Sequence, residues 1–195
     1  WEANALDGKD TQYRNAPGHD STGRFIPYWY RQGGRVSLEP LKDYDLEGAG
    51  DYYLTPVQTG KPQLMEPFEY TINGKVKQIT TVSVPIKLEG EIAGAVGIDI
   101  TLNALSELID GIKPYETGYA FVLSNEGQFV AHPDKEVEGK MAHRYGISEK
   151  VLDAVNRGGE TSEEKIGVHT GKLSYLKYVP INVGETDKPW AFCVN

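Results

Sequence analysis

The sequence has little cysteine and no long apolar run. A single cysteine, Cys193, excludes an internal disulfide and a metal site built from several cysteines. No stretch of 18 apolar residues occurs, and the first ten residues lack a signal-peptide pattern, so no membrane span or targeting segment is predicted. The net charge is −8, and Lys and Arg form no basic run. Because phosphates require clustered basic side chains, nucleic acid is excluded as a partner.

Sequence motifs of catalysis are also missing. The four histidines are scattered, and no HExxH, C-x-x-C or GxSxG motif occurs. The short glycine-rich stretches at 48–51 and 94–97 lack the length and the lysine of a phosphate-binding loop. His132-Pro133-Asp134 ends a predicted strand and is expected to cap the segment after it. We therefore expect no enzyme, no metal site and no cofactor.

The composition favours strands and turns. The chain has 195 residues with 39% hydrophobic content, which can form one core or two small ones, and it contains 22 Gly and 12 Tyr. Residues 68–100 predict an antiparallel meander that turns at 73–74 and at 89–90. A helix is predicted over residues 101–112 and stops at Lys113-Pro114.

The last strand of this meander ends in a carboxylate. Ala93, Ala95, Gly97 and Asp99 share one face because side chains alternate along a strand. Small side chains that lead to one acid predict a concavity in which Asp99 holds a cationic group. Alternatively, the small residues let a helix pack closely and Asp99 caps the helix that follows.

Aromatic and basic residues are concentrated between positions 24 and 31. This stretch contains Arg24, Tyr28, Trp29, Tyr30 and Arg31. Aromatic faces beside guanidinium groups can enclose a small polar ligand, although the same residues also suit a small cluster beneath a long loop. Strand alternation predicts that at most one of the two arginines lines a pocket with Trp29.

Residues 42–68 have the Gly and Pro content of a covering loop, with about one helical turn expected near Tyr52. Long covering loops often close over ligands. Asp45, Tyr53 and Phe68 belong to this segment. Together with Asp99, the acids and aromatics favour a ligand that carries a positively charged nitrogen.

The second half of the chain repeats the order of elements in the first. Two strands joined by a turn at 125–127, a helix over 148–157 and two further strands are predicted. The tripeptide Val-Pro-Ile occurs at 84–86 and again at 179–181. We therefore predict two related modules, residues 1–112 and 113–195. Trp190 and Phe192 are expected to fill any cavity in the second module, so that only the first binds ligand.

Several motifs carry a resemblance to a known family. GRFIPYWYR, EPF, the VPI and GEIAGAVGIDI strand pair and GYAFVLSNEGQFVAHPD occur in this order, over nearly the whole chain. In this the chain resembles the double Cache domain of bacterial and archaeal chemoreceptors (methyl-accepting chemotaxis proteins) and sensor histidine kinases. The resemblance implies an α+β fold of two tandem PAS-like modules, each an antiparallel sheet with flanking helices and loops. Family members usually begin with a long helix that spans both modules, which this sequence lacks.

The resemblance also implies a location and a role. The domain is expected in the periplasmic or extracellular region of a membrane-anchored homodimer, where the first, membrane-distal module binds a small molecule. Asp99 matches the acid that takes the ligand amino group in the family's amino-acid-binding subset, and Trp29-Tyr30 look like its Trp-Tyr pair. Pro27 stands where that subset has Arg, and Phe68 where it has Tyr.

The expected ligand is an amino acid or amine. If the ligand has a carboxylate, Arg24 or Arg31 is expected to bind it. A small carboxylate as ligand, or an interaction module that binds no small molecule, are the alternatives. The candidate ligand-binding residues are Asp99, Trp29, Tyr30, Tyr28, Arg24, Arg31, Tyr53, Phe68 and Asp45.

Overall fold

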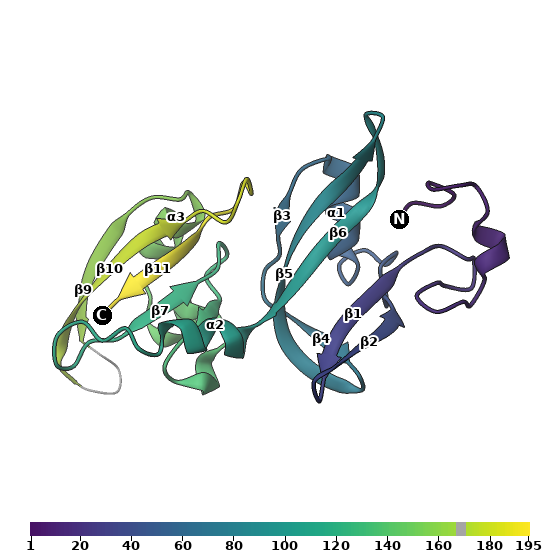
Figure 1. Ribbon diagram of the computed structural model, residues 1–195. Coiled ribbons are helices and arrows are strands. Elements are labelled where there is room, and N and C mark those ends of the chain that lie inside the picture. The colour runs from purple at the N-terminus through teal and green to yellow at the C-terminus, as the bar shows by residue number, and fades with distance from the viewer. Residues whose placement is uncertain (167–170) are drawn as a thin grey trace. The chain divides into compact units, whose positions relative to one another are not determined.

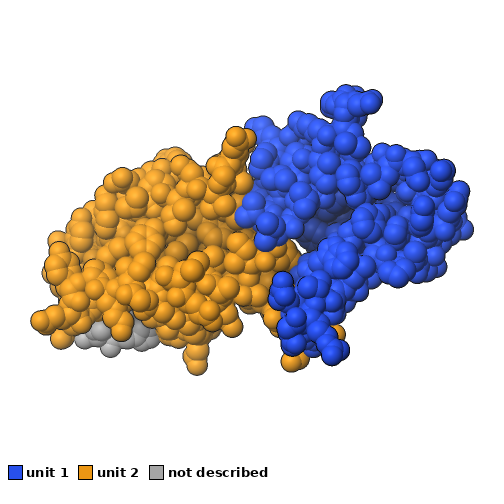
Figure 2. Space-filling view, viewed as in Figure 1, with its two compact units in different colours: residues 1–63, 82–98 blue, residues 64–81, 99–195 orange. Residues whose placement is uncertain are grey.

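The computed structural model describes residues 1–166 and 171–195, which form two compact units (Figure 2). Unit 1 comprises residues 1–63 and 82–98, and unit 2 comprises residues 64–81 and 99–195. Among the described residues, every helix is too short or too polar to span a bilayer.

Unit 1 contains a short helical turn, a hairpin and a helix. The elements are η1 (Asp10–Tyr13), β1 (Pro27–Gln32), β2 (Arg35–Pro40) and α1 (Asp51–Thr59). Strands β1 and β2 pair antiparallel around Gly33-Gly34, whose φ angles of 55° and 79° suit a tight hairpin turn. Helix α1 has nine residues and so exceeds the single turn predicted near Tyr52. It extends because it buries Tyr52, Tyr53 and Pro56.

The predicted meander is confirmed. Strands β4 (Phe68–Ile72), β5 (Lys75–Leu88) and β6 (Glu91–Thr101) are joined by the turns at 73–74 and 89–90, and the short strand β3 (Gln63–Leu64) also pairs with β5 (Figure 1). Asn73 and Gly74 both have positive φ, as do Glu89 and Gly90. This is the geometry that two-residue hairpin loops require.

The small-residue face of β6 is covered at its start. Ala93 is 5% exposed, and its carbonyl accepts a hydrogen bond from the Glu2 amide at 2.8 Å. A Cβ atom on Gly94 would lie 2.9 Å from Trp1 Cα, so only glycine permits this approach. Trp1 and Glu2 therefore lie along β6 at Ala93 and Gly94, whose Cβ positions are on opposite faces of the strand.

Helix α2 (Leu102–Ile109) is shorter than the predicted 101–112. Its N-cap is Thr101, whose side chain accepts a hydrogen bond from the Ala104 amide at 3.3 Å. The capping role considered for Asp99 therefore belongs to Thr101. Within unit 2, α2 buries Leu102, Ser106 and Ile109 and packs on β7 and β8.

Unit 2 is organised around a five-stranded antiparallel sheet in the order β8-β7-β11-β10-β9 (Figure 1). The strands are β7 (Ala120–Leu123), β8 (Phe129–Ala131), β9 (Thr161–Ile166), β10 (Leu173–Ile181) and β11 (Trp190–Val194). Helix α3 (Glu149–Asn156), capped by Ser148, packs on the sheet, and the short helices η2 (Lys135–Val137) and η3 (Ala142–Tyr145) follow β8. Strand β9 was not predicted, because its residues TSEEKI are mostly polar.

One face of this sheet forms the core of unit 2. The core residues include Phe121, Phe129, Val151, Tyr178 and Cys193. Each large apolar side chain buried in this way contributes about 1.5–3 kcal/mol. The predicted α+β fold with two modules built on antiparallel sheets is confirmed.

The expectation that Trp190 and Phe192 fill any cavity of the second module is wrong. Ala191 and Cys193 on β11 belong to the core. Because side chains alternate along a strand, Trp190 and Phe192 point to the opposite face of the sheet. The bulky residues are therefore on the wrong face to occupy space beside the core.

Candidate functional site

Arg24 is the most highly connected of the predicted site residues in unit 1. Its Nε and Nη2 donate to the Trp1 carbonyl at 3.1 and 2.9 Å, and Nη2 also donates to the Tyr53 hydroxyl at 2.6 Å. The Glu2 carboxylate lies 3.5 Å from Nη2. Because these protein groups occupy Nε and Nη2, the guanidinium is held in place without a ligand.

Two tyrosine rings complete the surroundings of Arg24. The guanidinium carbon lies 5.0 Å from the centre of the Tyr44 ring and 5.4 Å from that of Tyr53, distances that permit cation–π attraction. The Tyr53 hydroxyl donates to the Glu2 carboxylate, and burial together with this hydrogen bond raises the pKa of Tyr53. Tyr53 was predicted as a site residue, whereas Tyr44 was not.

Asp20 fixes the turn that leads into Arg24. Its Oδ1 accepts hydrogen bonds from the amides of Thr22, Gly23 and Arg24 at 2.8, 2.8 and 3.0 Å, and its Oδ2 accepts from the Tyr44 hydroxyl at 2.5 Å. Burial favours protonation of Asp20, but these hydrogen bonds outweigh it and lower its pKa to about 2. Burial and the bond to Asp20 raise the pKa of Tyr44 to about 12. Asp20 was not among the predicted residues, although the Asp-x-Thr-Gly pattern that it begins is a sequence signal for a turn of this kind.

The other predicted residues of unit 1 are more exposed. Tyr28 and Tyr30 stack with ring centres 6.2 Å apart on one face of β1. Trp29 is 60% exposed, and Arg31 and Asp45 are also exposed. The structure therefore brings Arg24 and Tyr53 together, but it does not enclose Trp29, Arg31 or Asp45.

Asp99 and Phe68 fall in unit 2. The hydroxyl of Thr81, which is 2% exposed, donates to Asp99 Oδ1 at 2.6 Å. A buried donor of this kind fixes the orientation of the carboxylate. Phe68 makes an edge-to-face contact with Tyr70, with ring centres 6.3 Å apart.

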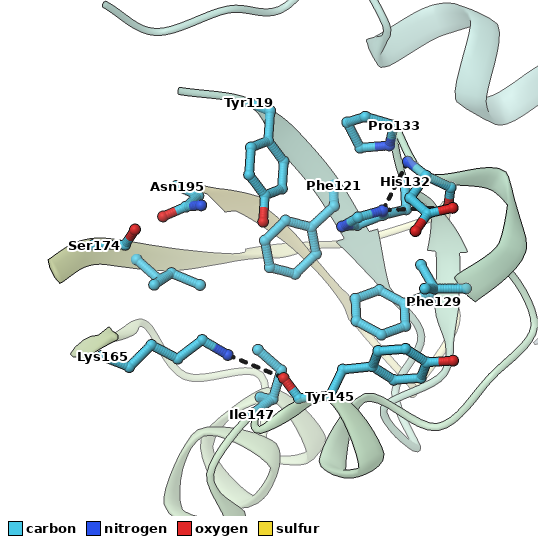
Figure 3. Close-up of a pocket in the computed structure, with 13 residues that line it drawn as sticks. Tyr119, Phe121, Phe129, His132, Pro133, Tyr145, Ile147, Lys165, Ser174 and Asn195 are labelled. Carbon is cyan, nitrogen blue, oxygen red and sulfur yellow. Dashed lines mark hydrogen bonds between the residues drawn. The ribbon is translucent and has the colours of Figure 1, made fainter. Parts of the chain in front are cut away.

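Unit 2 contains a pocket that the sequence did not predict (Figure 3). Its volume is about 240 Å³. The lining residues come from β7, β8, β9 and β10 and from the segments around η2 and η3. They are Tyr119, Phe121, Phe129, His132, Pro133, Asp134, Val137, Tyr145, Ile147, Lys165, Ser174, Leu176 and Asn195. Neither Trp190 nor Phe192 is among them.

Aromatic rings form most of the wall of this pocket. The His132 ring lies 5.1 to 5.7 Å from the ring centres of Tyr119, Phe121 and Phe129. Tyr145 meets Phe129 edge to face at 5.6 Å. Aromatic pairs in such tilted or edge-to-face contacts hold their side chains in defined orientations.

His132 and Asp134 form a local turn at one end of the pocket. The Asp134 amide donates to His132 Nδ1 at 3.0 Å, and the Asp134 carbonyl lies 3.3 Å from the same nitrogen. Burial lowers the pKa of His132, which keeps the ring neutral at pH 7. Asp134 Oδ1 accepts from the Glu136 amide at 3.0 Å and caps η2, which confirms the capping role predicted for this motif.

Lys165 provides the cationic group of the pocket. Its Nζ donates to the Tyr145 carbonyl at 3.3 Å, as Figure 3 shows. Burial lowers the pKa of Lys165. Ser174 pairs directly with Lys165 in the β9–β10 ladder, and both residues are partly buried. Side chains of directly paired residues lie on the same face of a sheet, so the two polar groups are neighbours.

Comparisons with known proteins identify the family of the chain. The family model for the first PDC sensor domain of methyl-accepting chemotaxis protein-like proteins matches residues 3–107. The methyl-accepting chemotaxis protein TlpQ of Pseudomonas aeruginosa is 28% identical over 152 residues, which are 68% of this chain and 21% of TlpQ. The chain thus matches about a fifth of this curated relative.

Solved structures show the same architecture. The extracellular domain of a protein named as the histidine kinase mmHK1S-Z3 has a TM-score of 0.86 and 37% identity, with coverage of 99% of this chain and 69% of that chain. The domain of P. aeruginosa PctB in complex with L-Arg has a TM-score of 0.58 and 23% identity, with coverage of 86% and 69%. At this identity the second likeness shows the fold alone.

Proposed function

We propose that the chain, which belongs to the methyl-accepting chemotaxis protein-like family of PDC sensor domains, binds an amino acid or amine through its first module, residues 1–112 of the sequence. It is an extracytoplasmic sensor region of a chemoreceptor or sensor kinase. The observation that carries the proposal is the extent of the family match. Residues 3–107 include Asp99 and all the other predicted ligand-binding residues.

Asp99 is the proposed partner of the ligand's cationic nitrogen. Its carboxylate is held by the Thr81 hydroxyl, while the helix-capping role belongs to Thr101. A carboxylate that is oriented in advance and does not cap a helix suits an ammonium group. The complex of PctB with L-Arg supports only that this fold can hold an amino acid.

The aromatic residues of β1 are proposed to contact the body of the ligand. Tyr28 and Tyr30 stack on one face of the strand, and Trp29 lies on the other. Arg24 is engaged by Trp1, Glu2 and Tyr53, so it is a weaker candidate for a ligand carboxylate than the sequence indicated. The engagement of Arg24 by protein groups favours a ligand that is recognised mainly through its nitrogen over a purely anionic carboxylate.

Signalling then follows from differential binding. A ligand shifts a receptor between two signalling states only by the difference between its affinities for them. We propose that the full-length protein is a membrane-anchored homodimer in which occupancy of the first module biases this equilibrium. The sensor region itself is proposed to be non-catalytic.

Calorimetric titration tests the ligand class with three matched compounds: an amino acid, its decarboxylated amine and its deaminated acid. We expect the amino acid or the amine to bind and the deaminated acid to bind more weakly. Asp99→Asn should weaken binding at least 30-fold, since loss of one partner of a buried charge pair costs about 2–5 kcal/mol. Glu47→Gln, at an exposed carboxylate outside the candidate ligand-binding residues, is the matched control and should leave binding unchanged.

Two results would contradict the proposal. The first is preferential binding of the deaminated acid, and the second is unchanged affinity in Asp99→Asn. The melting temperature of Asp99→Asn should remain close to that of the parent, because Thr101 caps α2. This measurement separates loss of binding from loss of folding.

A further inference from the structure

We propose that the pocket of unit 2 is a second ligand site, which binds a small monocarboxylate with an aromatic or branched apolar body. The pocket lies entirely within unit 2, and all of its lining residues are described. The inference does not depend on which ligand the first module takes. It extends the sensor function to a site that the sequence had assigned to side-chain packing.

The dimensions of the pocket suit a single substituted ring. An apolar cavity of about 150 Å³ is sufficient to bind benzene. This pocket has a volume of about 240 Å³, which leaves room for a ring and a short carboxylate arm. Its walls are built from Phe121, Phe129, Tyr145, Ile147 and Leu176, so the body of the ligand would contact carbon atoms almost everywhere.

The shape of the pocket is fixed by the packing of its rings. The rings around this cavity are fixed against each other, with His132, Phe121 and Phe129 at centre distances of 5.1 to 5.7 Å. They therefore hold the cavity open, which a ligand-binding site requires.

The charge at one wall selects the polar end of the ligand. An ammonium group has three donors; Lys165 Nζ donates one hydrogen bond to the neutral Tyr145 carbonyl, and the Glu163 carboxylate acts on it through its charge. Ser174 lies directly opposite Lys165 and adds a hydroxyl donor. An ammonium and a hydroxyl in a pocket lined largely by apolar side chains are suited to a carboxylate.

The acidic groups nearby are already engaged. Asp134 accepts the Glu136 amide as the cap of η2, and Glu163, two positions before Lys165 on β9, accepts the Tyr178 hydroxyl at 3.0 Å. His132 accepts the Asp134 amide through Nδ1. A ligand amine would therefore meet the positive charge of Lys165, so the pocket favours an anion over an amine even though aromatic rings surround it.

The experiment compares three probes of similar shape: phenylacetate, 2-phenylethylamine and 2-phenylethanol. Each is titrated calorimetrically into the whole 195-residue chain. We expect saturable binding of phenylacetate at least tenfold tighter than that of the other two. Lys165→Met keeps the aliphatic length without the charge and should weaken phenylacetate binding about 10- to 100-fold.

Two further variants separate binding in the pocket of unit 2 from binding at the first module. Ser174→Leu places an apolar side chain at the polar wall and should also abolish phenylacetate binding. Asp99→Asn should leave phenylacetate binding unchanged, while Lys165→Met should leave amino acid or amine binding at the first module unchanged. Failure of this proposal and failure of the proposed function are thereby observed in different variants.

Three outcomes would overturn the inference. They are absence of saturable phenylacetate binding, equal or tighter binding of the amine or the alcohol, and unchanged phenylacetate affinity in Lys165→Met. The variants must retain the parent's circular dichroism spectrum and melting behaviour. If Lys165→Met fails to fold, Ser174→Leu provides the same comparison from the facing strand.

Discussion

Each unit has one prominent cation whose surroundings differ sharply. Arg24 in unit 1 contacts a carbonyl, a hydroxyl, a carboxylate and two tyrosine rings. Lys165 in unit 2 donates to one carbonyl beside a cavity of about 240 Å³. Both side chains are partly buried, so burial alone does not distinguish them.

The contrast separates a structural charge from a charge available to a ligand. Several protein partners compensate the desolvation of Arg24, and its removal would leave those partners unsatisfied. Lys165 has fewer such partners, namely the Tyr145 carbonyl and the charge of Glu163, and it borders a pocket in which a ligand could add to them. Arg24, which the sequence suggested as a ligand-binding residue, has the surroundings of a structural charge. Lys165, which the sequence did not suggest, has the surroundings of a ligand-binding group.

The largest predicted effect is on the stability of unit 1. Arg24→Ala leaves Glu2 and the Tyr53 hydroxyl without their cation and should lower the free energy of unfolding by about 2–3 kcal/mol, less than for a fully buried pair. Lys165→Met is the comparison in unit 2 and should change stability by less than about 0.5 kcal/mol. Urea unfolding of both variants measures the difference. Equal losses would mean that the contrast between the two cations is wrong.

Two carboxylates sharpen the comparison, because their pKa values shift in opposite directions. Asp20 in unit 1 accepts five hydrogen bonds, which overcome burial and lower its pKa to about 2. Glu66 in unit 2 is more deeply buried, and burial raises its pKa. Its Oε2 has no hydrogen-bond partner among the described residues.

Asp20→Ala should destabilise the protein by about 1–2 kcal/mol at pH 7, a figure reduced for the solvent exposure of this group. A lowered pKa means that the unfolded state binds the proton more tightly, so the contribution is complete above about pH 4 and is lost as the pH falls toward 2. The unfolding free energies of parent and variant should therefore converge over this window. A constant difference down to pH 2 would exclude the carboxylate as the source.

Glu66→Gln should give the smallest effect and the opposite sign. Because the pKa of Glu66 is raised on folding, its ionisation destabilises the folded state as the pH rises above about 4.5. We expect the variant to be more stable than the parent by about 0.5–1 kcal/mol at pH 7, with the difference vanishing below pH 4. Thermal unfolding at both pH values measures this. Glu136→Gln, at an exposed carboxylate, serves as the control.

Much of the fold could be predicted from local sequence. The turns at 73–74, 89–90 and 125–127 and the helix that begins after Ser148 were placed correctly, because turn residues and caps act over a few positions. Strand β9 was missed because its half-buried face carries Thr161, Glu163 and Lys165 in place of apolar residues, and only its pairing with β10 makes it a strand. Helix α1 was underestimated for a similar reason, since the burial of its tyrosines is a tertiary effect.

The candidate site could be predicted only in part. The strand ending at Asp99 was recognised, but its donor Thr81 comes from β5, a neighbour in space and not in sequence. The partners of Arg24 likewise come from residues 1, 2, 44 and 53. A pattern of residue types along one segment shows which side chains are able to bind a ligand. It does not show whether residues of other segments already contact those side chains.

The sequence by itself determined the family, the α+β class, the meander of β4, β5 and β6 and the absence of catalytic motifs. These features depend on local periodicity, turn chemistry and recognisable motifs. Tertiary structure decided which face of β11 carries Ala191 and Cys193, and with it that Trp190 and Phe192 leave the pocket open. It also decided that Arg24 is engaged and that Lys165 borders a cavity. The physical reason is that satisfaction of a charge and filling of a volume depend on all the segments that meet at a point, whereas a sequence pattern describes only one of them.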